Sequence, residues 1–403
     1  MINGPVNIIR LQGDIDGIDK VIYLFLDFHM EVTTQTQCQD IFSKDVQKYF
    51  VDSFYHLSKG DRTYDFFLEI YPSELADLKP KRHSGIDYKD KYIEEVVKFF
   101  RKVFKYDSKK NKVMVNKLFK NVRLHYIDVR DYYKLTIHDQ MSLMIELAHG
   151  FMCKDGIDLR ELRHIVQFME IMRDHFELII DSLEEPTVSN NFKPRIIKHQ
   201  SDRADVKTLK YLSNKIKTSY KHKNVEKIMN KLVNESIDNF SSSIDYINES
   251  IEVLSSYEDQ IYGSENSLIR DDNSTTIFGY GLSSYTIRNM IVEIVNRVDK
   301  LFDDNFIGFF ARLMDIYFLR RFLDKDYITN VIAYTGAMHS NTYIYMLVKY
   351  FGFKITDMSH HTMPIKQINN EIKERSLMET QELILPKQLI QCSNMSSFPE
   401  NFL

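Results

Sequence analysis

Strand-length runs of apolar residues occur near both ends of this 403-residue chain, and its long middle has none. The runs "VIYLFLDFH" (21–29), "YDFFLEI" (64–70) and "NVIAYTG" (330–336) are typical of buried β-strands. From about residue 136 to about residue 320, apolar residues recur only at helical spacing. We therefore predict one sheet that both ends of the chain complete and that a long helical insertion interrupts.

The first third of the chain alternates between strand and helix patterns. "VNIIRLQGDIDGIDKVIYLFLDF" reads as a β-hairpin around a Gly- and Asp-rich turn, and helical spacing follows in "YIEEVVKFFRKVF". This alternation predicts an α/β fold with a central mixed or parallel sheet flanked by helices. The boundaries that we expect are 1–135 and 326–365 for the two halves of the α/β domain, 136–325 for the helical insertion and covering helices, and 366–403 for a polar C-terminal tail with a weak helix at best.

The composition argues against several classes of protein. A net charge of −4 gives no basic footprint for nucleic acid, and no apolar stretch reaches the roughly 18 residues that a membrane span needs. The N-terminus lacks the basic and apolar regions of a signal peptide. Three distant cysteines, Cys38, Cys153 and Cys392, suggest a reducing compartment and no disulfides. We therefore expect a cytoplasmic protein without a nucleic-acid partner or a transmembrane segment.

Residue usage also bears on the origin of the chain. Tryptophan is absent, whereas tyrosine, phenylalanine, isoleucine, lysine and asparagine are abundant. AT-rich codons favour this set, so the chain resembles proteins of large DNA viruses with AT-rich genomes, although AT-rich protists would show the same composition. For a viral protein the expected location is the host cytoplasm or the virion, where virion proteins are candidate partners.

The predicted strands end in acidic residues, histidines and an arginine. In open α/β sheets, ligands bind in the crevice beyond the carboxyl ends of the strands. In chain order, the strand ends carry Asp27 and His29, Glu69, Asp128 and Arg130, His339, and Asp357 with His360 and His361. Two imidazoles with carboxylates make a divalent metal site with a position left open for water. The alternative is that these are incidental polar residues at the ends of buried strands.

His339 lies in "YTGAMHSNTY", where a strand meets a helix. Gly336 allows a sharp turn there because it has no side chain, and Ser340 or Asn341 can cap the helix that follows. The backbone would thus fix His339 at the sheet edge, as a metal ligand or a general base requires.

Two further charged residues have competing interpretations. Asp315, in the apolar helix "FIGFFARLMDIYFLRRF", is either a buried acid directed at the site or, as we favour, a partner of Arg312 or Arg320. Arg130 either binds a carboxylate or phosphate of a substrate or pairs with a neighbouring aspartate.

Several of these motifs together resemble the TraB/Tiki metalloprotease superfamily. They are "LDFH" (26–29), "FFLEI" (66–70), and "GAMH" (336–339) followed by a helix and "YFGFKI". The superfamily, which takes in erythromycin-esterase-like and haem-uptake ChaN-like proteins, has a Gly-x-x-His motif near each end and a Glu on the strand after the first. Residues 336–339 match the second motif in full, whereas Leu26 stands where the first has glycine. The resemblance covers roughly residues 1–130 and 330–357 and leaves the helical middle unaccounted for.

The resemblance implies a metal-dependent hydrolase, peptidase- or esterase-like, that acts on a protein or peptide substrate. His29 and His339 would hold a divalent ion of the Mn, Co or Zn type. Glu69 would be a third ligand or the base that activates water, and Asp27 would assist in catalysis. We expect three of the other strand-end residues to contact the substrate; they are Asp128, Arg130 and His360.

Two other readings stay open. The chain can keep this fold without the chemistry, as a viral structural or protein-interaction protein whose helical insertion is the working surface. Alternatively, following the ChaN-like relatives, the histidines would be haem ligands; we regard this as the less favoured cofactor.

Overall fold

The computed structural model describes most of the chain, which divides into two compact units. The α/β unit comprises Met1–Val129, Tyr220–Ile228 and Met314–Leu403, and the helical unit comprises Arg130–Ser219 and Met229–Leu313. The described residues are 1–29, 38–69, 92–107, 112–130, 138–154, 156–184, 202–264, 282–302 and 304–402.

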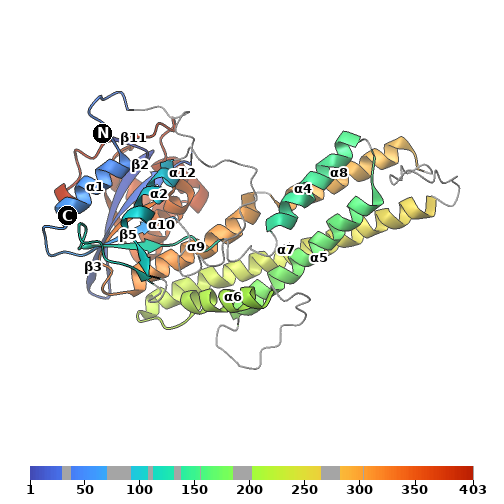
Figure 1. The fold of residues 1–403 in the computed structure, drawn as a ribbon, viewed down its shortest axis with the longest axis horizontal. Helices are drawn as coiled ribbons and strands as arrows, with labels where there is room; N and C mark the ends of the chain where they lie inside the picture. The colour runs from blue at the N-terminus through green and yellow to red at the C-terminus, as the bar shows by residue number, and fades with distance from the viewer. Residues whose placement is uncertain are drawn as a thin grey trace. The chain divides into compact units, whose positions relative to one another are not determined.

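A mixed sheet forms the centre of the α/β unit, which confirms the predicted fold class (Figure 1). Its strands are β2 (Asn7–Ile15), β3 (Ile18–Asp27), β5 (Tyr64–Leu68), β8 (Val122–Tyr126), β9 (Asn330–Gly336) and β10 (Lys354–Met358). They lie in the order β10-β2-β3-β9-β5-β8. β3, β9, β5 and β8 run parallel, and β2 is antiparallel to both of its neighbours. The two ends of the chain therefore complete one sheet.

Aromatic side chains fill the core on one face of this sheet. Because successive side chains of a strand point to opposite faces, Tyr23 and Phe25 of β3 lie on the same face. They pack in one cluster with residues of α1 (Val46–Leu57) and α2 (Tyr92–Val103). The ring centroids of Phe25 and Phe50 of α1, for example, are 4.8 Å apart.

The helix α10 (Ala337–Phe351) packs against β2, β3 and β9. Its C-terminal cap is Gly352, whose φ of 69° lies in the left-handed region that glycine adopts without a steric penalty. The chain then returns to the sheet as β10. This agrees with the strand, helix, glycine and strand that the sequence predicts for this stretch.

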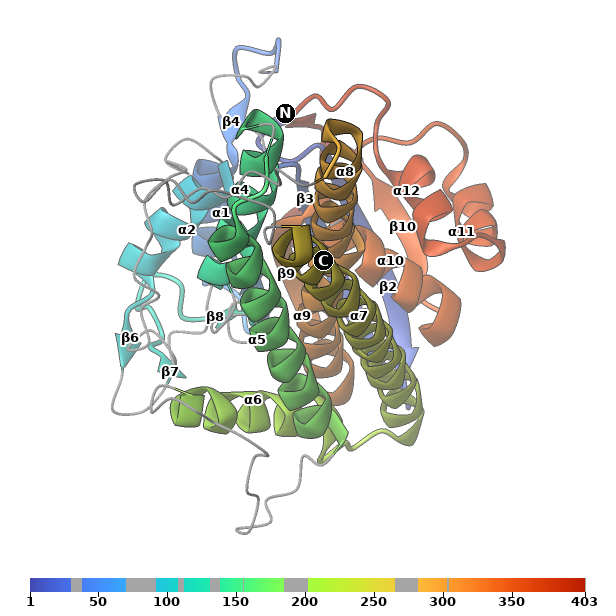
Figure 2. The ribbon, with the colours of Figure 1, turned by 90° about the vertical axis from the view of Figure 1, so that its right-hand side faces the viewer.

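The chain after residue 365 is folded, so the prediction of a polar tail with a weak helix at best was wrong. Helices α11 (Ile365–Glu374) and α12 (Leu377–Ile384) pack on α10, and α11 also contacts β10 (Figure 2). Ile368 and Ile372, four residues apart, are buried on one side of α11. A capping box headed by Ser376 starts α12. A few apolar residues at helical spacing are enough to dock this segment.

A small second sheet joins the N-terminus to the C-terminal segment. Its order is β11-β1-β4, and each of its strands has two residues: β1 (Ile2–Asn3), β4 (Lys44–Asp45) and β11 (Cys392–Ser393). A 3-10 turn, η4 (Glu400–Phe402), follows β11. Elsewhere β6 (Tyr106–Asp107) and β7 (Lys112–Val113) form a short hairpin after α2.

The expectation of a chain without disulfides was also wrong. A disulfide joins Cys38 to Cys392, with their Cα atoms 5.1 Å apart and a sequence separation of 354. The small sheet explains the encounter, because Cys392 pairs with Asn3 and the Asn3 side chain accepts a hydrogen bond from the Cys38 amide at 3.0 Å. Cys153 is a free, exposed thiol.

The described residues of the helical unit form helices and no strand (Figure 2). These are α4 (His138–Lys154), α5 (Leu159–Glu184), α6 (Asp202–Lys217), α8 (Ser284–Leu301), most of α7 (Lys223–Ser264) and the first part of α9 (Asp304–Asp324). Phenylalanines from three helices meet in the core, with Phe240 5.1 Å from Phe176 and 5.6 Å from Phe310 between ring centroids. The boundaries at 136 and 325 stay a prediction. Within the described ranges, no helix is long and apolar enough to cross a membrane.

Candidate functional site

Three adjacent strands bring His29, Glu69 and His339 together at one edge of the main sheet. β9 lies between β3 and β5 and runs parallel to both, so the carboxyl ends of the three strands are neighbours. His29 lies just beyond β3, Glu69 directly follows β5, and His339 is in the first turn of α10 after β9. The strand-end pattern therefore identified residues that the fold gathers in one place.

Gly336 is the close-packed centre of this site. Its backbone N–H donates a hydrogen bond of 2.6 Å to Oε2 of Glu69. A Cβ atom on residue 336 would lie 2.9 Å from Nε2 of His29 and 3.4 Å from Oε2 of Glu69. The missing side chain therefore leaves space for the His29 ring, whereas the backbone does not need glycine, because a φ of −52° is open to any residue.

The predicted cap of the helix that carries His339 was wrong. The N-cap residue of α10 is Gly336, and no side chain caps the helix. Ser340 instead shares a hydrogen bond of 2.9 Å with Thr335, and the Asn341 side chain donates to the Leu377 carbonyl at 3.0 Å. The close contact of Gly336 with Glu69, rather than a cap, fixes this turn.

An aspartate orients each of the two imidazoles. Nδ1 of His29 lies 2.6 Å from Oδ2 of Asp27, and Nδ1 of His339 lies 2.7 Å from Oδ1 of Asp315. Because an ionised carboxylate only accepts hydrogen bonds, Nδ1 carries the proton in both rings. Tyr334 donates to the other oxygen of Asp27 at 2.7 Å and so holds that carboxylate in turn. Carboxylates in this position are the usual outer partners of metal-binding histidines.

The other nitrogen of each ring faces the same carboxylate oxygen. Nε2 of His29 lies 3.8 Å and Nε2 of His339 lies 3.6 Å from Oε1 of Glu69. Both separations are too long for hydrogen bonds. In the neutral form of each ring this nitrogen carries a lone pair, so two imidazole nitrogens and a carboxylate oxygen would then face one another. A cation or a proton between them would relieve this repulsion.

The separations are close to those within a metal site. Ligand atoms about 2.1 Å from a tetrahedral ion are about 3.4 Å apart. Among the described residues, no three or more His, Cys, Asp or Glu side chains are already gathered closely enough to hold a metal ion. Binding would therefore draw each imidazole nitrogen a few tenths of an ångström closer to Oε1 of Glu69. The donor set of two imidazoles and one carboxylate fits such an ion.

The site is buried except on the His29 side. The His29 side chain is 37% exposed, against 7% for His339 and 2% for Glu69. Burial alone would lower the pKa of His29, but its hydrogen bond to Asp27 and the negative charges of Asp27 and Glu69 outweigh burial and raise it to about 10. The position of this ring therefore favours positive charge.

The His29 backbone is held in an uncommon conformation. Its φ of 57° is left-handed, which few residues other than glycine adopt. The His29 N–H donates to Oδ2 of Asp27 at 2.8 Å, so the carboxylate that orients the ring also fixes the backbone. Strain of this kind is concentrated at functional sites.

The three residues expected to contact substrate lie on other elements than the cluster of His29, Glu69 and His339. Asp128 follows β8, the neighbour of β5, and is buried. His360 follows β10, which β2 separates from β3, and its backbone N–H and carbonyl bond the Asn7 side chain. Arg130 belongs to the helical unit, and Asp131 beside it lies outside the described residues. Their roles stay predictions.

Sequence reasoning underestimated two members of the site. Asp315, for which we favoured pairing with an arginine, bonds His339 instead. Nothing in the sequence indicated that Tyr334 would bond Asp27, because a buried tyrosine in a strand is ordinarily a core residue. Leu26, at the position where the superfamily pattern has glycine, is fully buried within β3.

The whole chain, residues 1–403, matches the model of a family of unknown function (DUF5847). Uncharacterized protein R706 of Acanthamoeba polyphaga mimivirus is 53% identical over 406 residues, which cover 100% of this chain and 97% of that protein. Uncharacterized protein R161 of the same virus is 35% identical over 432 residues, which cover 100% and 98%. These relatives agree with the viral origin expected from residue usage. No solved structure matches the chain.

Proposed function

The chain belongs to a family of unknown function, DUF5847, and from its site we propose that it is a metal-dependent hydrolase of peptide or ester bonds. One observation carries the proposal. Two imidazole nitrogens face one carboxylate oxygen at 3.6 and 3.8 Å, and an aspartate holds Nδ1 of each ring, so Nε2 is the nitrogen that each ring would offer to a metal. The resemblance of "LDFH", "FFLEI" and "GAMH" to TraB/Tiki motifs supports the same reading.

His29, His339 and Glu69 would hold the ion. Imidazole and carboxylate ligands together suit Zn, Mn or Co. The arrangement favours a single ion over haem, because Glu69 lies within 3.8 Å of both Nε2 atoms and so occupies the space that a planar macrocycle would need. When bound, the ion would polarise a substrate carbonyl and make water more acidic.

The other groups of the site would position the reacting atoms. The Gly336 N–H holds Oε2 of Glu69, which directs Oε1 toward the two imidazoles for ligation or for accepting a proton from water. Asp27 and Asp315 keep their histidines in one tautomer. A protein or peptide substrate would approach from the exposed side of His29. The host cytoplasm and the virion are both suitable locations.

Metal content is the first test. Protein purified without chelators should contain about one equivalent of divalent metal by elemental analysis, and His29→Ala and His339→Ala should contain none. The exposed His361, which bonds only the nearby Met363 carbonyl among the described residues, gives a matched control, His361→Ala, that should keep its metal. At a hundredfold excess over Kd, metal should stabilise the wild type by about 2.7 kcal/mol and leave both site variants unchanged.

The outcome also separates the two classes of function. Metal together with peptidase or esterase turnover supports the hydrolase. A wild-type protein that stays metal-free in saturating Zn, Mn or Co would refute it and would leave a viral structural or interaction protein that keeps the fold.

A further inference from the structure

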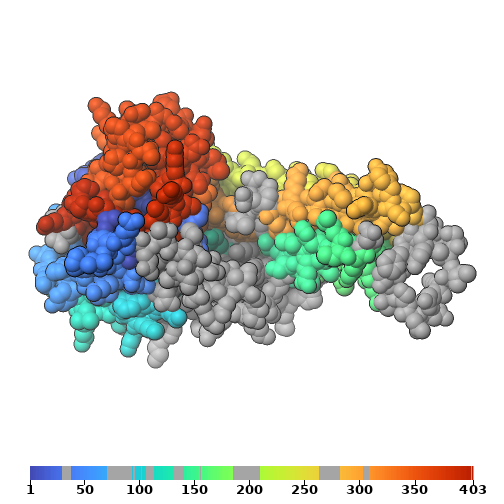
Figure 3. Space-filling model, turned by 90° about the horizontal axis from the view of Figure 1, so that it is seen from above, coloured from blue at the N-terminus to red at the C-terminus, as the bar shows by residue number. Residues whose placement is uncertain are grey.

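The Cys38–Cys392 disulfide ties the C-terminal end of the chain to the N-terminal region, which few other backbone hydrogen bonds join to it. We call residues 391–402 the C-terminal segment; it contains β11 and η4. Among the described residues, its backbone pairs through the two residues of β11 against β1, the Gly4 N–H donates to the Gln391 carbonyl at 3.1 Å, and the Ser393 hydroxyl donates to the Pro5 carbonyl at 2.9 Å. Figure 3 shows this end of the chain, in deep red, on the surface against blue N-terminal residues.

Docking of the segment also buries a polar side chain unfavourably. Gln391 is 1% exposed, and neither its amide nitrogen nor its amide oxygen has a hydrogen-bond partner among the described residues. Burying an amide without partners opposes docking, because water would satisfy both atoms. A covalent link next to Gln391 offsets this penalty, since it keeps the segment close to its docking site.

The rest of the segment docks through aromatic contacts. Phe402 meets Tyr23 edge-on with ring centroids 4.9 Å apart, and Phe398 lies 6.3 Å from the same ring. The Tyr49 hydroxyl donates to the Met395 sulfur at 3.1 Å. The segment thus covers the aromatic core where α1 meets β3.

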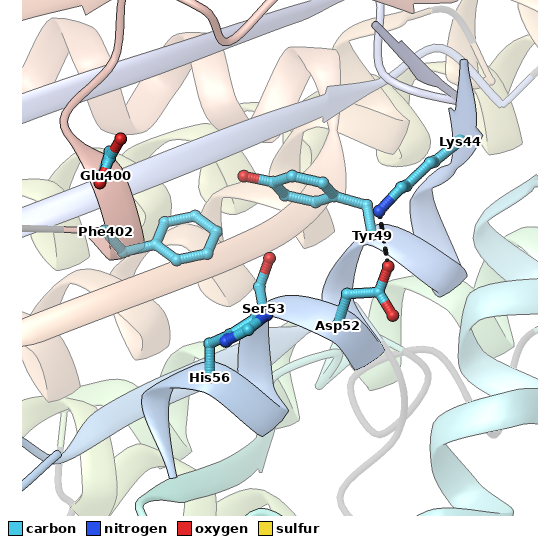
Figure 4. A pocket seen from close by; sticks show the side chains of 7 residues that line it. All are labelled: Lys44, Tyr49, Asp52, Ser53, His56, Glu400 and Phe402. Carbon is cyan, nitrogen blue, oxygen red and sulfur yellow. Dashed lines mark hydrogen bonds and ion pairs between the residues drawn. The ribbon is translucent and has the colours of Figure 1, made fainter. Parts of the chain in front are cut away.

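A cavity lies beneath the segment. It has a volume of about 530 Å³ and lies between α1 and η4. Figure 4 shows Tyr49, Ser53 and His56 of α1 on one side and Phe402, whose ring points toward them, on the other, with Glu400 beside it. Movement of the C-terminal segment would remove one wall of this cavity.

Both cysteines are partly exposed, so reductants can reach the bond. A viral protein is made in the reducing cytosol of its host and meets oxidising surroundings outside the cell. We propose that the Cys38–Cys392 disulfide is a redox-operated latch: when oxidised it holds the C-terminal segment on the aromatic core, and when reduced it lets this segment detach and opens the cavity. The proposal does not depend on the metal site.

The reaction is thiol–disulfide exchange. A thiolate attacks one sulfur, the Cys38–Cys392 bond breaks, and a mixed disulfide forms. A second thiol then resolves it, so the protein gains two thiols while two external thiols, or one dithiol, become a disulfide.

Hydrogen exchange of the full chain, read by mass spectrometry, tests the latch. Wild-type protein is compared before and after treatment with dithiothreitol, and Cys392→Ser gives the open state without a reductant. Amides of the C-terminal segment should exchange at least about thirtyfold faster in the reduced protein and in Cys392→Ser. This factor corresponds to the lower end of the stabilisation that a disulfide typically gives. Cys153→Ser, which removes the exposed free thiol and keeps the disulfide, should exchange like the wild type.

Two results would overturn the proposal. Unchanged exchange in residues 391–402 after reduction would mean that the aromatic contacts hold the segment alone. Equal loss of protection in α5 of the helical unit would mean that the disulfide supports the whole fold and is not a local latch. Should Cys392→Ser fail to fold, reduction of the folded wild type decides between these outcomes.

Discussion

Replacement of Gly336 by alanine tests the proposed metal site separately from the stability of the fold. The backbone at residue 336 (φ −52°, ψ 145°) is one that alanine adopts without strain. At such a position Gly→Ala stabilises the folded protein by about 0.4–1 kcal/mol, because the unfolded chain loses conformational entropy. The new Cβ would lie 2.9 Å from Nε2 of His29, so the exposed His29 ring must move outward by about 0.5 Å to reach ordinary contact. Metal ligands tolerate about 0.2 Å of displacement.

We therefore expect Gly336→Ala to bind metal about 10–100-fold more weakly, which is the usual loss when a residue that positions a metal ligand is changed. The stability of the metal-free protein should change by less than about 1 kcal/mol. Titration calorimetry with Zn²⁺ or Mn²⁺ measures the first effect and urea unfolding the second. Gly150→Ala is the control, because a Cβ on residue 150 meets nothing within 4 Å. Undiminished metal affinity in Gly336→Ala would refute the proposed role of His29.

Three further changes have defined outcomes. Asp315→Asn should weaken metal binding about 10–100-fold, because His339 loses the acceptor that fixes its tautomer, and calorimetry measures this. Burial, aided by the Arg321 guanidinium beside it, lowers the pKa of His125 to about 4. The unfolded state therefore binds more protons below pH 6.5, and up to about 3 kcal/mol of stability should be lost between pH 6.5 and 4 in urea unfolding. Leu26→Gly should cost about 3–5 kcal/mol in the same assay without a gain of hydrolysis, because Leu26 is fully buried.

Each of these has its own control. Asp357→Asn, a carboxylate on β10, should leave metal affinity unchanged. His125→Gln should flatten the pH dependence of stability; if the slope persists, other groups cause it. A Leu26→Gly protein that is stable and hydrolyses peptides or esters would mean that the leucine blocks a competent site.

The strand-end rule predicted which residues meet at this edge of the sheet because it depends on topology alone. Asp27, His29, Glu69 and His339 each follow an apolar run, and parallel strands bring such positions to one edge. The rule could not give the strand order that puts β9 between β3 and β5, which makes these positions immediate neighbours.

Asp315 was harder to assign because α9 is apolar nearly all round. Periodicity gives no preferred face in such a helix, so it cannot tell whether an acid points to the sheet or to an arginine. The disulfide was hidden for a different reason. Cys38 and Cys392 are 354 residues apart, and the strands that bring them together have two residues each, too short for any periodic pattern.

Crystals of the wild-type protein grown with Mn²⁺ or Zn²⁺ give the most direct test of the metal site. An anomalous difference map should show one peak about 2.0–2.2 Å from Nε2 of His29, Nε2 of His339 and Oε1 of Glu69. His29→Ala crystals should lose that peak and keep the fold. A map of the wild type with no peak among these three atoms, at metal concentrations that saturate binding in solution, would contradict the account.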